Sequence, residues 1–475
     1  MRYLLNLAYL LLVLLGLPWF LYKSITAKKY REGFRQKFLG LVPRREGDRP
    51  CVWFHAVSVG EVRALRTVLE AVRRRRPEWQ CVVSTTTRTG MQTAQSLYPD
   101  LCLFYCPLDF TWAVSSALRR VRPDLLALVE LELWPNLIHQ ARRAGVRVAL
   151  VNGRMSPHSY RGYRRVRSFA RRFLGPIDAL GVQNEEYAQR FRDLGVVPSR
   201  ITVTGSVKYD AIETDRSNPR TRALADLLGI GPDEIVFVAG STLEPEEEIA
   251  LDAYLGLLVN HPRLRFVLVP RHPERFDRVA RLLADRQVAY VRRSLIKEGK
   301  TTGTNPKAVI LVDTLGELSA LWGMAHLAFV GGSLAPRGGQ NMIEPAAFGA
   351  AVLFGPNTWN FKETVEALVA CGGAVCLNNP SELQPALGEL LADPQRAVQM
   401  GQAARRYVVG QQGGSARTAV LLETIVDGKS ELWTSSQPAY NAHSGSGIGP
   451  PHISAENDRK GIPSAGRSAR RRERR

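Results

Sequence analysis

The stretch Phe329–Pro356, FVGGSLAPRGGQNMIEPAAFGAAVLFGP, carries the clearest structural signal in the chain. Two short apolar runs, 327–330 and 351–354, read as buried strands that flank a glycine-rich loop and the start of a helix. Glycine lacks a Cβ and tolerates positive φ, so this loop lets the backbone approach a ligand closely. The stretch predicts α/β structure with a ligand site beside a strand end. A plain glycine-rich turn between two buried strands is the alternative.

Polar residues at the end of the same loop favour a nucleotide as the ligand. Asn341 precedes a helix expected over Met342–Phe348, whose N-terminal N–H groups and dipole favour a phosphate. Glu344 lies in the first turn, where a carboxylate can accept hydrogen bonds from ribose hydroxyls. The sequence therefore predicts that a nucleotide is held here by its sugar and phosphate.

Strand-like runs alternate with amphipathic stretches along the chain, the pattern typical of parallel α/β sheets. A polar stretch at 211–221 reads as a linker. The strands expected before it are 52–55, 81–85, 101–105, 125–129, 147–151, 179–182 and 201–204, and those expected after it are 235–239, 266–269, 289–291, 309–312, 327–330, 351–354 and 374–377. We expect two Rossmann-like, doubly wound domains, over 40–212 and 213–428.

Composition limits the class of protein and of partner. The 475 residues are 45% hydrophobic and 23% charged, as in a folded globular protein, and the chain is too long for one core. A net charge of +20 indicates an anionic partner: nucleic acid, an anionic membrane face or a phosphorylated substrate. The six cysteines show neither a CxxC pair nor metal-type spacing, which indicates free core thiols rather than a disulfide framework.

Both ends of the chain differ from the rest. Leu4–Tyr22 is almost wholly apolar and is followed by several lysines and arginines, which predicts a membrane anchor over 1–23 with the remainder in the cytoplasm. A cleaved signal peptide is the competing interpretation, disfavoured because the positive charges follow the apolar run. Whether the anchor spans the membrane or lies in its interface stays open. Residues 429–475, rich in Ser, Gly and Pro, are expected to form a disordered basic tail.

Carboxylates and a lysine follow strands of the first half, where ligands of such sheets bind. Glu61, in the segment HAVSVGE, suits a general base, although a first-turn residue that complements the helix dipole is the simpler interpretation. Glu130 and Glu132 follow the strand 125–129 and share a face if that strand continues. Lys208 can offset charge on a leaving phosphate, the alternative being a solvent-exposed lysine.

The second half supplies groups for binding a phosphate and a base. Arg271 follows a clean apolar strand and suits a bidentate phosphate clamp. Leu315–Glu317 lies after the strand 309–312 and can offer backbone groups to a base. The chain has no P-loop motif, no G-x-G-x-x-G after the first strand, no Asp-x-Asp and no histidine cluster with metal-ligand spacing. Phosphate handling is therefore expected to rest on Arg, Lys and helix dipoles rather than on a metal.

From the N-terminus to about Thr424 the chain resembles the 3-deoxy-D-manno-octulosonic acid (Kdo) transferases of lipopolysaccharide synthesis. The resemblance rests on ordered motifs: HAVSVGE, STTTRTG, ELELWPNL, NGRMSPHSYRGY, QNEEYAQRF, TGSVKYD, LVPRHPERF, DTLGEL and GGSLAPRGGQNMIEPAAFG. It implies the GT-B arrangement of two Rossmann-like domains. It also implies inverting, metal-independent transfer of Kdo from CMP-Kdo to a lipid A precursor, lipid IVA, at the cytoplasmic face of the inner membrane, without a cofactor and with no nucleic acid as primary partner.

The resemblance also assigns roles to individual residues. Glu61 matches the general base that deprotonates the acceptor hydroxyl, and Glu130 and Lys208 match positions that stabilise the transition state. The segments that match the CMP-binding residues are Pro270 and Arg271; Leu315, Gly316 and Glu317; and Asn341, Met342, Ile343 and Glu344.

Two departures and two rival functions accompany this interpretation. The family commonly shows S-T-H-x-G-E-E where this chain has Ser241–Glu247, STLEPEE, and Gln340 stands where His is frequent. A different nucleotide-sugar transferase or a 2-epimerase of the same fold is one rival. A non-catalytic membrane scaffold that recruits anionic partners through its basic faces is the other. The number of Kdo units transferred stays open.

Overall fold

The computed structural model describes residues 32–296 and 307–428, together with positions 6, 7, 9–11, 13 and 15. The tail expected over 429–475 lies outside these residues, as does most of the anchor expected over 1–23. Among the helices that the structure describes, none combines the length and the apolar character needed to cross a bilayer.

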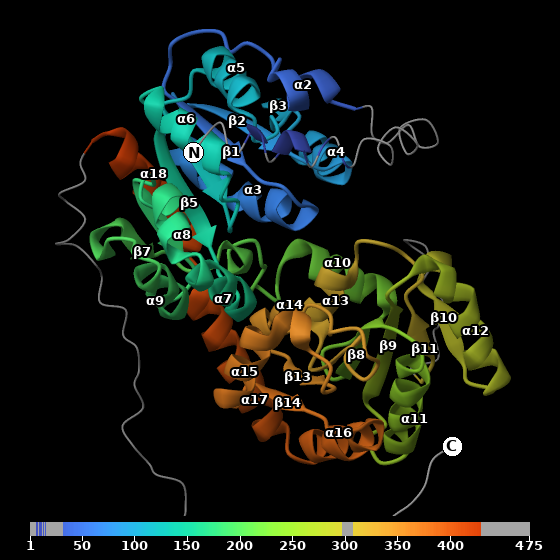
Figure 1. Cartoon of the computed structure of the whole chain (residues 1–475). Helices are drawn as coiled ribbons and strands as arrows, with labels where there is room; N and C mark the ends of the chain where they lie inside the picture. Colours follow the sequence, from blue (N-terminus) through green and yellow to red (C-terminus); the bar gives the residue numbers. More distant parts are fainter. Residues whose placement is uncertain are drawn as a thin grey trace, which may run out of the picture. The chain divides into compact units, whose positions relative to one another are not determined.

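The first half of the chain forms a seven-stranded, wholly parallel sheet in the order β3-β2-β1-β4-β5-β6-β7. Its strands are β1 (Cys51–His55), β2 (Gln80–Thr85), β3 (Cys102–Tyr105), β4 (Leu125–Val129), β5 (Arg147–Gly153), β6 (Ala179–Val182) and β7 (Ile201–Val203). The helices of this half are α2 (Phe34–Leu39), α3 (Val59–Arg75), α4 (Arg88–Leu97), α5 (Thr111–Val121), α6 (Pro135–Arg143), α7 (Pro157–Arg165), α8 (Arg167–Leu174) and α9 (Glu185–Asp193) (Figure 1).

The second half repeats the design with a seven-stranded parallel sheet in the order β10-β11-β9-β8-β12-β13-β14. Its strands are β8 (Ile235–Thr242), β9 (Leu264–Pro270), β10 (Tyr290–Arg292), β11 (Val309–Leu311), β12 (Leu327–Val330), β13 (Ala351–Phe354) and β14 (Ala374–Cys376). Its helices are α10 (Pro219–Leu228), α11 (Glu246–Leu258), α12 (Phe276–Asp285), α13 (Leu318–Met324), α14 (Ile343–Ala347), α15 (Lys362–Ala370), α16 (Leu383–Ala392), α17 (Pro394–Gln411) and α18 (Gly414–Val426).

Helices cover both faces of each sheet, which explains why the strands read as continuous apolar runs. Along β1, Trp53 belongs to one hydrophobic core and Phe54 to the core on the opposite face. Val238 and Phe237 of β8 divide in the same way in the second sheet. Every strand expected from the sequence is present, with bounds shifted by at most a few residues, so the doubly wound α/β fold is confirmed.

The helix α18 follows the second sheet in the sequence but packs on the first sheet. Its sequence position suggested the second domain, 213–428, but Leu421 and Leu422 are buried in the core of the first sheet together with Val52. Glu423 pairs with Arg75 and Arg76 at the end of α3. An amphipathic helix packs where its apolar face finds a partner, which its place in the sequence does not determine.

The linker expected over 211–221 is shorter than predicted. The helix α10 begins at Pro219, because the Asn218 side chain accepts a hydrogen bond from the Thr221 N–H at 3.0 Å and caps the helix. Proline fits this first helical position since no N–H is needed there. Only residues 211–218 of the expected linker therefore precede the helix.

Candidate functional site

Glu61 lies in the first turn of α3, directly after the loop that follows β1. Its carboxylate accepts hydrogen bonds from the Val57 N–H at 2.8 Å and the Ser58 hydroxyl at 2.7 Å, and the Glu61 N–H donates to the Ser58 oxygen at 3.2 Å. This reciprocal arrangement caps the helix and fixes the carboxylate, which is only 8% exposed. Glu61 is thus the first-turn residue of the simpler interpretation, and its carboxylate is also held at the carboxyl end of β1.

Glu130 and Glu132 do not share a strand face as expected, because β4 ends at Val129 and Glu130 adopts a positive φ of 58°. The carboxylate of Glu130 instead pairs with the Arg154 guanidinium at 3.0 Å. Burial raises the pKa of Glu130, and the nearby Glu61 raises it further, while Arg154 and Lys208 oppose the rise. Arg154 follows β5 within the segment NGRMSPHSYRGY, and sequence reasoning missed it although its place after a strand end was a usable signal.

Glu132 joins the same group of carboxylates. It accepts a hydrogen bond from the indole N–H of Trp134 at 2.8 Å. Burial raises the pKa of Glu132, the Trp134 hydrogen bond lowers it, and the negative charges of Glu61 and Glu130 raise it. The carboxylates of Glu61, Glu130 and Glu132 therefore lie near one another at the carboxyl edge of the first sheet.

Lys208 lies in a short 3-10 helix, Val207–Tyr209, just after β7. The residue is exposed, as the alternative interpretation expects, and its ammonium donates to the Thr364 hydroxyl at 3.3 Å. It is also close enough to Glu130 to lower that residue's pKa. The structure thus brings the three predicted catalytic residues, Glu61, Glu130 and Lys208, to one edge of one sheet, where Arg154 adds a second cation.

Arg271 begins the loop after β9, at the carboxyl edge of the second sheet. Its N–H donates to the Thr242 carbonyl at 2.9 Å, and Pro270, the last residue of β9, pairs with Thr242 across the sheet. The exposed guanidinium donates through Nε to the Gln340 side-chain oxygen at 3.2 Å. Arg271 and Gln340 therefore lie together beside the segment that begins at Asn341.

The segment Asn341–Glu344 differs in part from the prediction. The helix α14 is only five residues long, Ile343–Ala347, rather than Met342–Phe348, because Met342 is its N-cap residue and Phe348 its C-cap residue. The Asn341 side chain accepts a hydrogen bond from the Ile343 N–H at 3.1 Å. The Asn341 amide donates to Glu344 at 2.8 Å, and burial raises the pKa of Glu344 while that hydrogen bond opposes the rise. The Met342 and Ile343 side chains lie in the hydrophobic core, so only their backbones can reach a ligand.

The third predicted segment, Leu315–Glu317, follows β11 at the same edge. Gly316 has a φ of 88°, and Leu315 is 73% exposed. Glu317 accepts a hydrogen bond from the Arg293 guanidinium at 2.7 Å and another from the Thr314 hydroxyl. All three predicted CMP-binding segments thus lie at the carboxyl ends of strands β9, β11 and β12.

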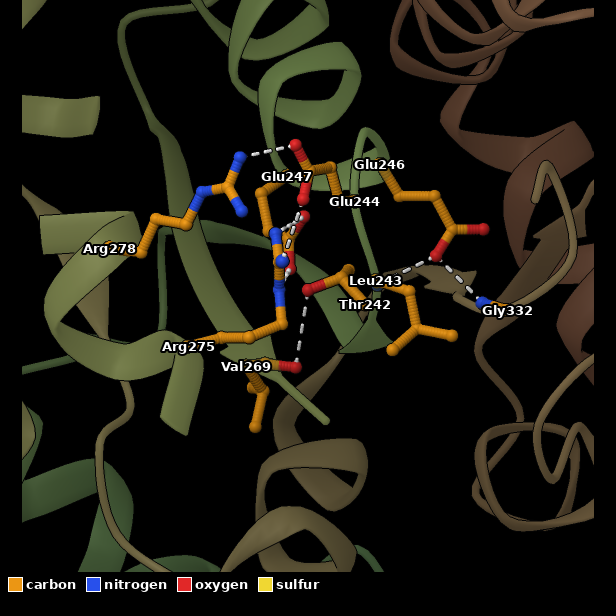
Figure 2. Close-up of polar contacts among 9 residues, drawn as sticks. All are labelled: Thr242, Leu243, Glu244, Glu246, Glu247, Val269, Arg275, Arg278 and Gly332. Atoms are coloured by element: carbon orange, nitrogen blue, oxygen red, sulfur yellow. Dashed lines mark hydrogen bonds and ion pairs between the residues drawn. The ribbon is translucent and has the colours of Figure 1, made fainter. Parts of the chain in front are cut away.

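The N–H groups of the glycine-rich loop after β12 bind a carboxylate of the same chain, a contact that the sequence analysis did not predict. The fully buried carboxylate of Glu246, at the start of α11, accepts hydrogen bonds from the N–H groups of Gly332, Ser333 and Leu334 at 2.7–2.9 Å. Figure 2 shows this carboxylate between Leu243 and Gly332. These amides are therefore satisfied by an internal anion.

Among the described residues, no group of three or more His, Cys, Asp or Glu side chains is arranged to hold a metal ion. All six cysteines are free, as expected, but only half of them are core thiols: Cys51, Cys81 and Cys106 are buried, whereas Cys102, Cys371 and Cys376 are exposed.

The two parallel sheets, each with its polar residues at the carboxyl edge, define a GT-B architecture. The fold is similar to that of a UDP-GlcNAc 2-epimerase from Neisseria meningitidis bound to UDP-GlcNAc, at a TM-score of 0.53 and 14% identity over 79% of this chain and 100% of that one.

Sequence comparison identifies the family. Residues 32–211 match the family model described as 3-deoxy-D-manno-octulosonic-acid transferase. The chain is 31% identical over 407 residues to the 3-deoxy-D-manno-octulosonic acid transferase of Haemophilus influenzae, covering 85% of this chain and 94% of that protein. It is 35% identical over 382 residues to the enzyme of the same name from Bordetella pertussis, covering 78% and 86%. The chain belongs to the Kdo transferase family and is a glycosyltransferase.

Proposed function

We propose that this enzyme transfers Kdo from CMP-Kdo to a lipid A precursor, lipid IVA, by an inverting, metal-independent displacement. The observation that carries the proposal is the group of Glu61, Glu130, Lys208 and Arg154 at the carboxyl edge of the first sheet. It offers a fixed carboxylate base beside two cations, the pattern that transfer to a hydroxyl with an anionic leaving group requires.

In the proposed reaction, Glu61 takes the proton of the 6′-hydroxyl of the acceptor disaccharide. The freed oxygen forms the new bond to the anomeric carbon of Kdo while the bond from that carbon to the phosphate oxygen breaks, and CMP leaves with the electron pair. Lys208 and Arg154 offset the negative charge that develops. Glu130, paired with Arg154 at 3.0 Å, holds that guanidinium in place.

The donor nucleotide is assigned to the second sheet. Arg271 is exposed and suits the phosphate, and Asn341 and Glu344 offer polar groups to the ribose and base. The exposed turn at Leu315–Glu317 offers backbone groups to the base.

We place the enzyme at the cytoplasmic face of the inner membrane. The net charge of +20 supports binding to an anionic lipid surface that holds the acidic acceptor. Leu7, Leu11 and Leu15 recur at helical spacing and are 54%, 52% and 80% exposed, as a lipid contact requires. The protein is expected to co-sediment with phosphatidylglycerol vesicles but not with phosphatidylcholine vesicles. Failure to co-sediment with either kind of vesicle would contradict this location.

The test is transfer by the detergent-solubilised full chain, with a CMP-Kdo regenerating system and lipid IVA, read by mass spectrometry. Wild type should add one or more Kdo masses, which also fixes the number of units. Glu61→Gln keeps an oxygen for the Val57 N–H and an amide for the Ser58 oxygen, so the fold should persist while turnover falls about 10²–10⁴-fold. Glu70→Gln, on the exposed side of the same helix, is the matched control.

Near-normal turnover of Glu61→Gln would refute the general-base role. A folded wild-type enzyme that adds no Kdo mass would refute the donor or the acceptor, and a parallel assay with UDP-sugars would then distinguish another nucleotide-sugar transferase.

A further inference from the structure

The carboxylate of Glu246 accepts four hydrogen bonds, all of them from backbone N–H groups. One oxygen accepts from the N–H groups of Leu243 at 2.9 Å and Gly332 at 2.7 Å, and the other accepts from Ser333 and Leu334, both at 2.9 Å. The side chain is fully buried. Four backbone donors on one carboxylate form charge-assisted bonds, which are stronger than neutral ones.

These bonds join two loops that the sequence separates by almost ninety residues. Gly332–Leu334 follows β12, while Leu243 lies between β8 and α11 and Glu246 is the first residue of α11. Figure 2 shows Leu243, Glu246 and Gly332. The loops also touch through their backbones, because a Cβ on Gly331 would lie 2.5 Å from the Ser241 carbonyl oxygen. Glu246 therefore fixes the backbone of the glycine-rich loop as well as the start of its own helix.

The fixed loop in turn holds the segment next to the predicted donor residues. The Gly339 N–H donates to the Gly332 carbonyl at 2.8 Å, and the Gln340 N–H donates to the Gly331 carbonyl at 3.1 Å. The Gln340 side chain then accepts the Arg271 guanidinium at 3.2 Å. A short, continuous series of hydrogen bonds thus runs from the buried carboxylate to an exposed cation.

Asn341 follows Gln340 directly and its amide donates to Glu344 at 2.8 Å, so the orientation of both residues depends on the same loop. Since the amides of Gly332–Leu334 are already satisfied by Glu246, a donor phosphate has to be recognised by groups other than these three amides.

We propose that Glu246 is a positioning residue for the donor nucleotide. Its carboxylate binds the amides of the glycine-rich loop in the place that a bound anion would otherwise take. It thereby sets the positions of Gln340, Arg271 and Asn341, without touching the substrate. This role rests on the proposed function, because it takes the nucleotide to be bound by those residues.

The variant Glu246→Gln tests the role with almost no change in volume. An amide has one acceptor oxygen, so two of the four N–H donors would face an NH₂ group instead. Glu247→Gln is the matched control: Glu247 is the next residue, is 2% exposed, and within the described part of the chain its carboxylate bonds to Arg275 and not to the loop. Both variants lose a buried charge interaction, and only one of them disturbs the loop.

Two measurements on the detergent-solubilised full chain decide the matter. With CMP as the probe in calorimetry, Glu246→Gln should bind at least about tenfold more weakly, which corresponds to about 1.4 kcal/mol, while Glu247→Gln binds as wild type does. In transfer assays the KM for the donor should rise by the same factor, and the KM for the lipid acceptor should not change.

Hydrogen exchange of the free protein provides a readout that does not depend on the donor. Peptides spanning 331–341 should exchange faster in Glu246→Gln and at the wild-type rate in Glu247→Gln. Equal effects of the two variants, or unchanged exchange in Glu246→Gln, would overturn the positioning role. Wild-type protein that binds no CMP, together with faster exchange in Glu246→Gln, would refute the CMP donor and support the positioning of the loop.

Discussion

The ion pair between Arg275 and Glu247 offers a quantitative test of how the start of α11 is held. Arg275, in the 3-10 turn Pro273–Arg275 after β9, reaches both oxygens of Glu247 at 3.1 Å and one oxygen of Glu244 at 3.0 Å. The Glu247 side chain is 2% exposed, whereas that of Glu244 is 51% exposed. The change to make is Arg275→Met, which keeps an unbranched apolar stem and removes the charge.

The magnitude follows from what the change leaves behind. Glu247 would stay buried with no other hydrogen-bond donor among its described contacts, and removing one partner of a buried pair costs about 3–5 kcal/mol. Arg275 is 17% exposed, so water can reach the vacated site and the lower end, about 3 kcal/mol, is expected. For a domain of this size that lowers Tm by roughly 6–12 °C.

The assay is thermal unfolding of the full chain in detergent, followed by intrinsic fluorescence. Arg278→Met is the control, because Arg278 and its partner Glu244 are 62% and 51% exposed and such surface pairs contribute about 0–1 kcal/mol. The double variant Arg275→Met, Glu247→Met should regain most of the lost Tm, since it removes the uncompensated charge. A loss in Arg275→Met no larger than in Arg278→Met, or a double variant no more stable than the single one, would refute the reasoning.

Two further changes extend the tests. Gly331→Ala places a Cβ 2.5–2.6 Å from backbone atoms of Ser241 and Thr242, so it should separate the two loops and weaken CMP binding in calorimetry by more than tenfold, whereas Gly162→Ala, with open space around it, should leave binding unchanged. Burial raises the pKa of Asp109 to about 6, so the stability that its proton confers is complete below about pH 4 and is lost as the pH rises through 6. The Tm of wild type should therefore fall relative to Asp109→Asn between pH 4.5 and 7, and parallel curves would contradict this.

The central strands, such as β1, β4 and β9, were predictable because each is a short apolar run buried on both faces, which leaves a continuous signal in the sequence. The placement of α18 was not, because its buried residues, such as Leu421 and Leu422, say only that the helix has an apolar face and not which sheet receives it. The short α14 was also missed. It is one residue shorter at each end than predicted, because Met342 and Phe348 are its cap residues, and local propensity does not record either cap.

Within the candidate site, residues that follow strand ends were predictable and residues that organise loops were not. Arg271 comes directly after β9, and Glu61 and Lys208 come within a few residues after β1 and β7. Parallel topology brings such positions to the carboxyl edge of their sheet. Glu246 came to notice only as part of a retained run of glutamates. Its role depends on the amides of Gly332 and its neighbours, which lie far along the chain, so nothing near Glu246 in the sequence signals it.

The contacts of Glu246 explain how the loop tolerates the departure from the family motif at Leu243–Pro245. The loop needs from position 243 only a backbone N–H for Glu246, and any residue except proline supplies one. Pro245 lies at the N-cap of α11, where a missing N–H costs no helical hydrogen bond. Glu244 adds ion pairs to Arg275 and Arg278 on the solvent side. The exchange therefore keeps Glu246 and Glu247, which fix the loop and the helix start, and it changes the half-buried Leu243 and the exposed Glu244 and Pro245. Its effect is then expected in donor recognition rather than in the fold of the loop, because the hydrogen bonds of Glu246 do not depend on the side chains at 243–245.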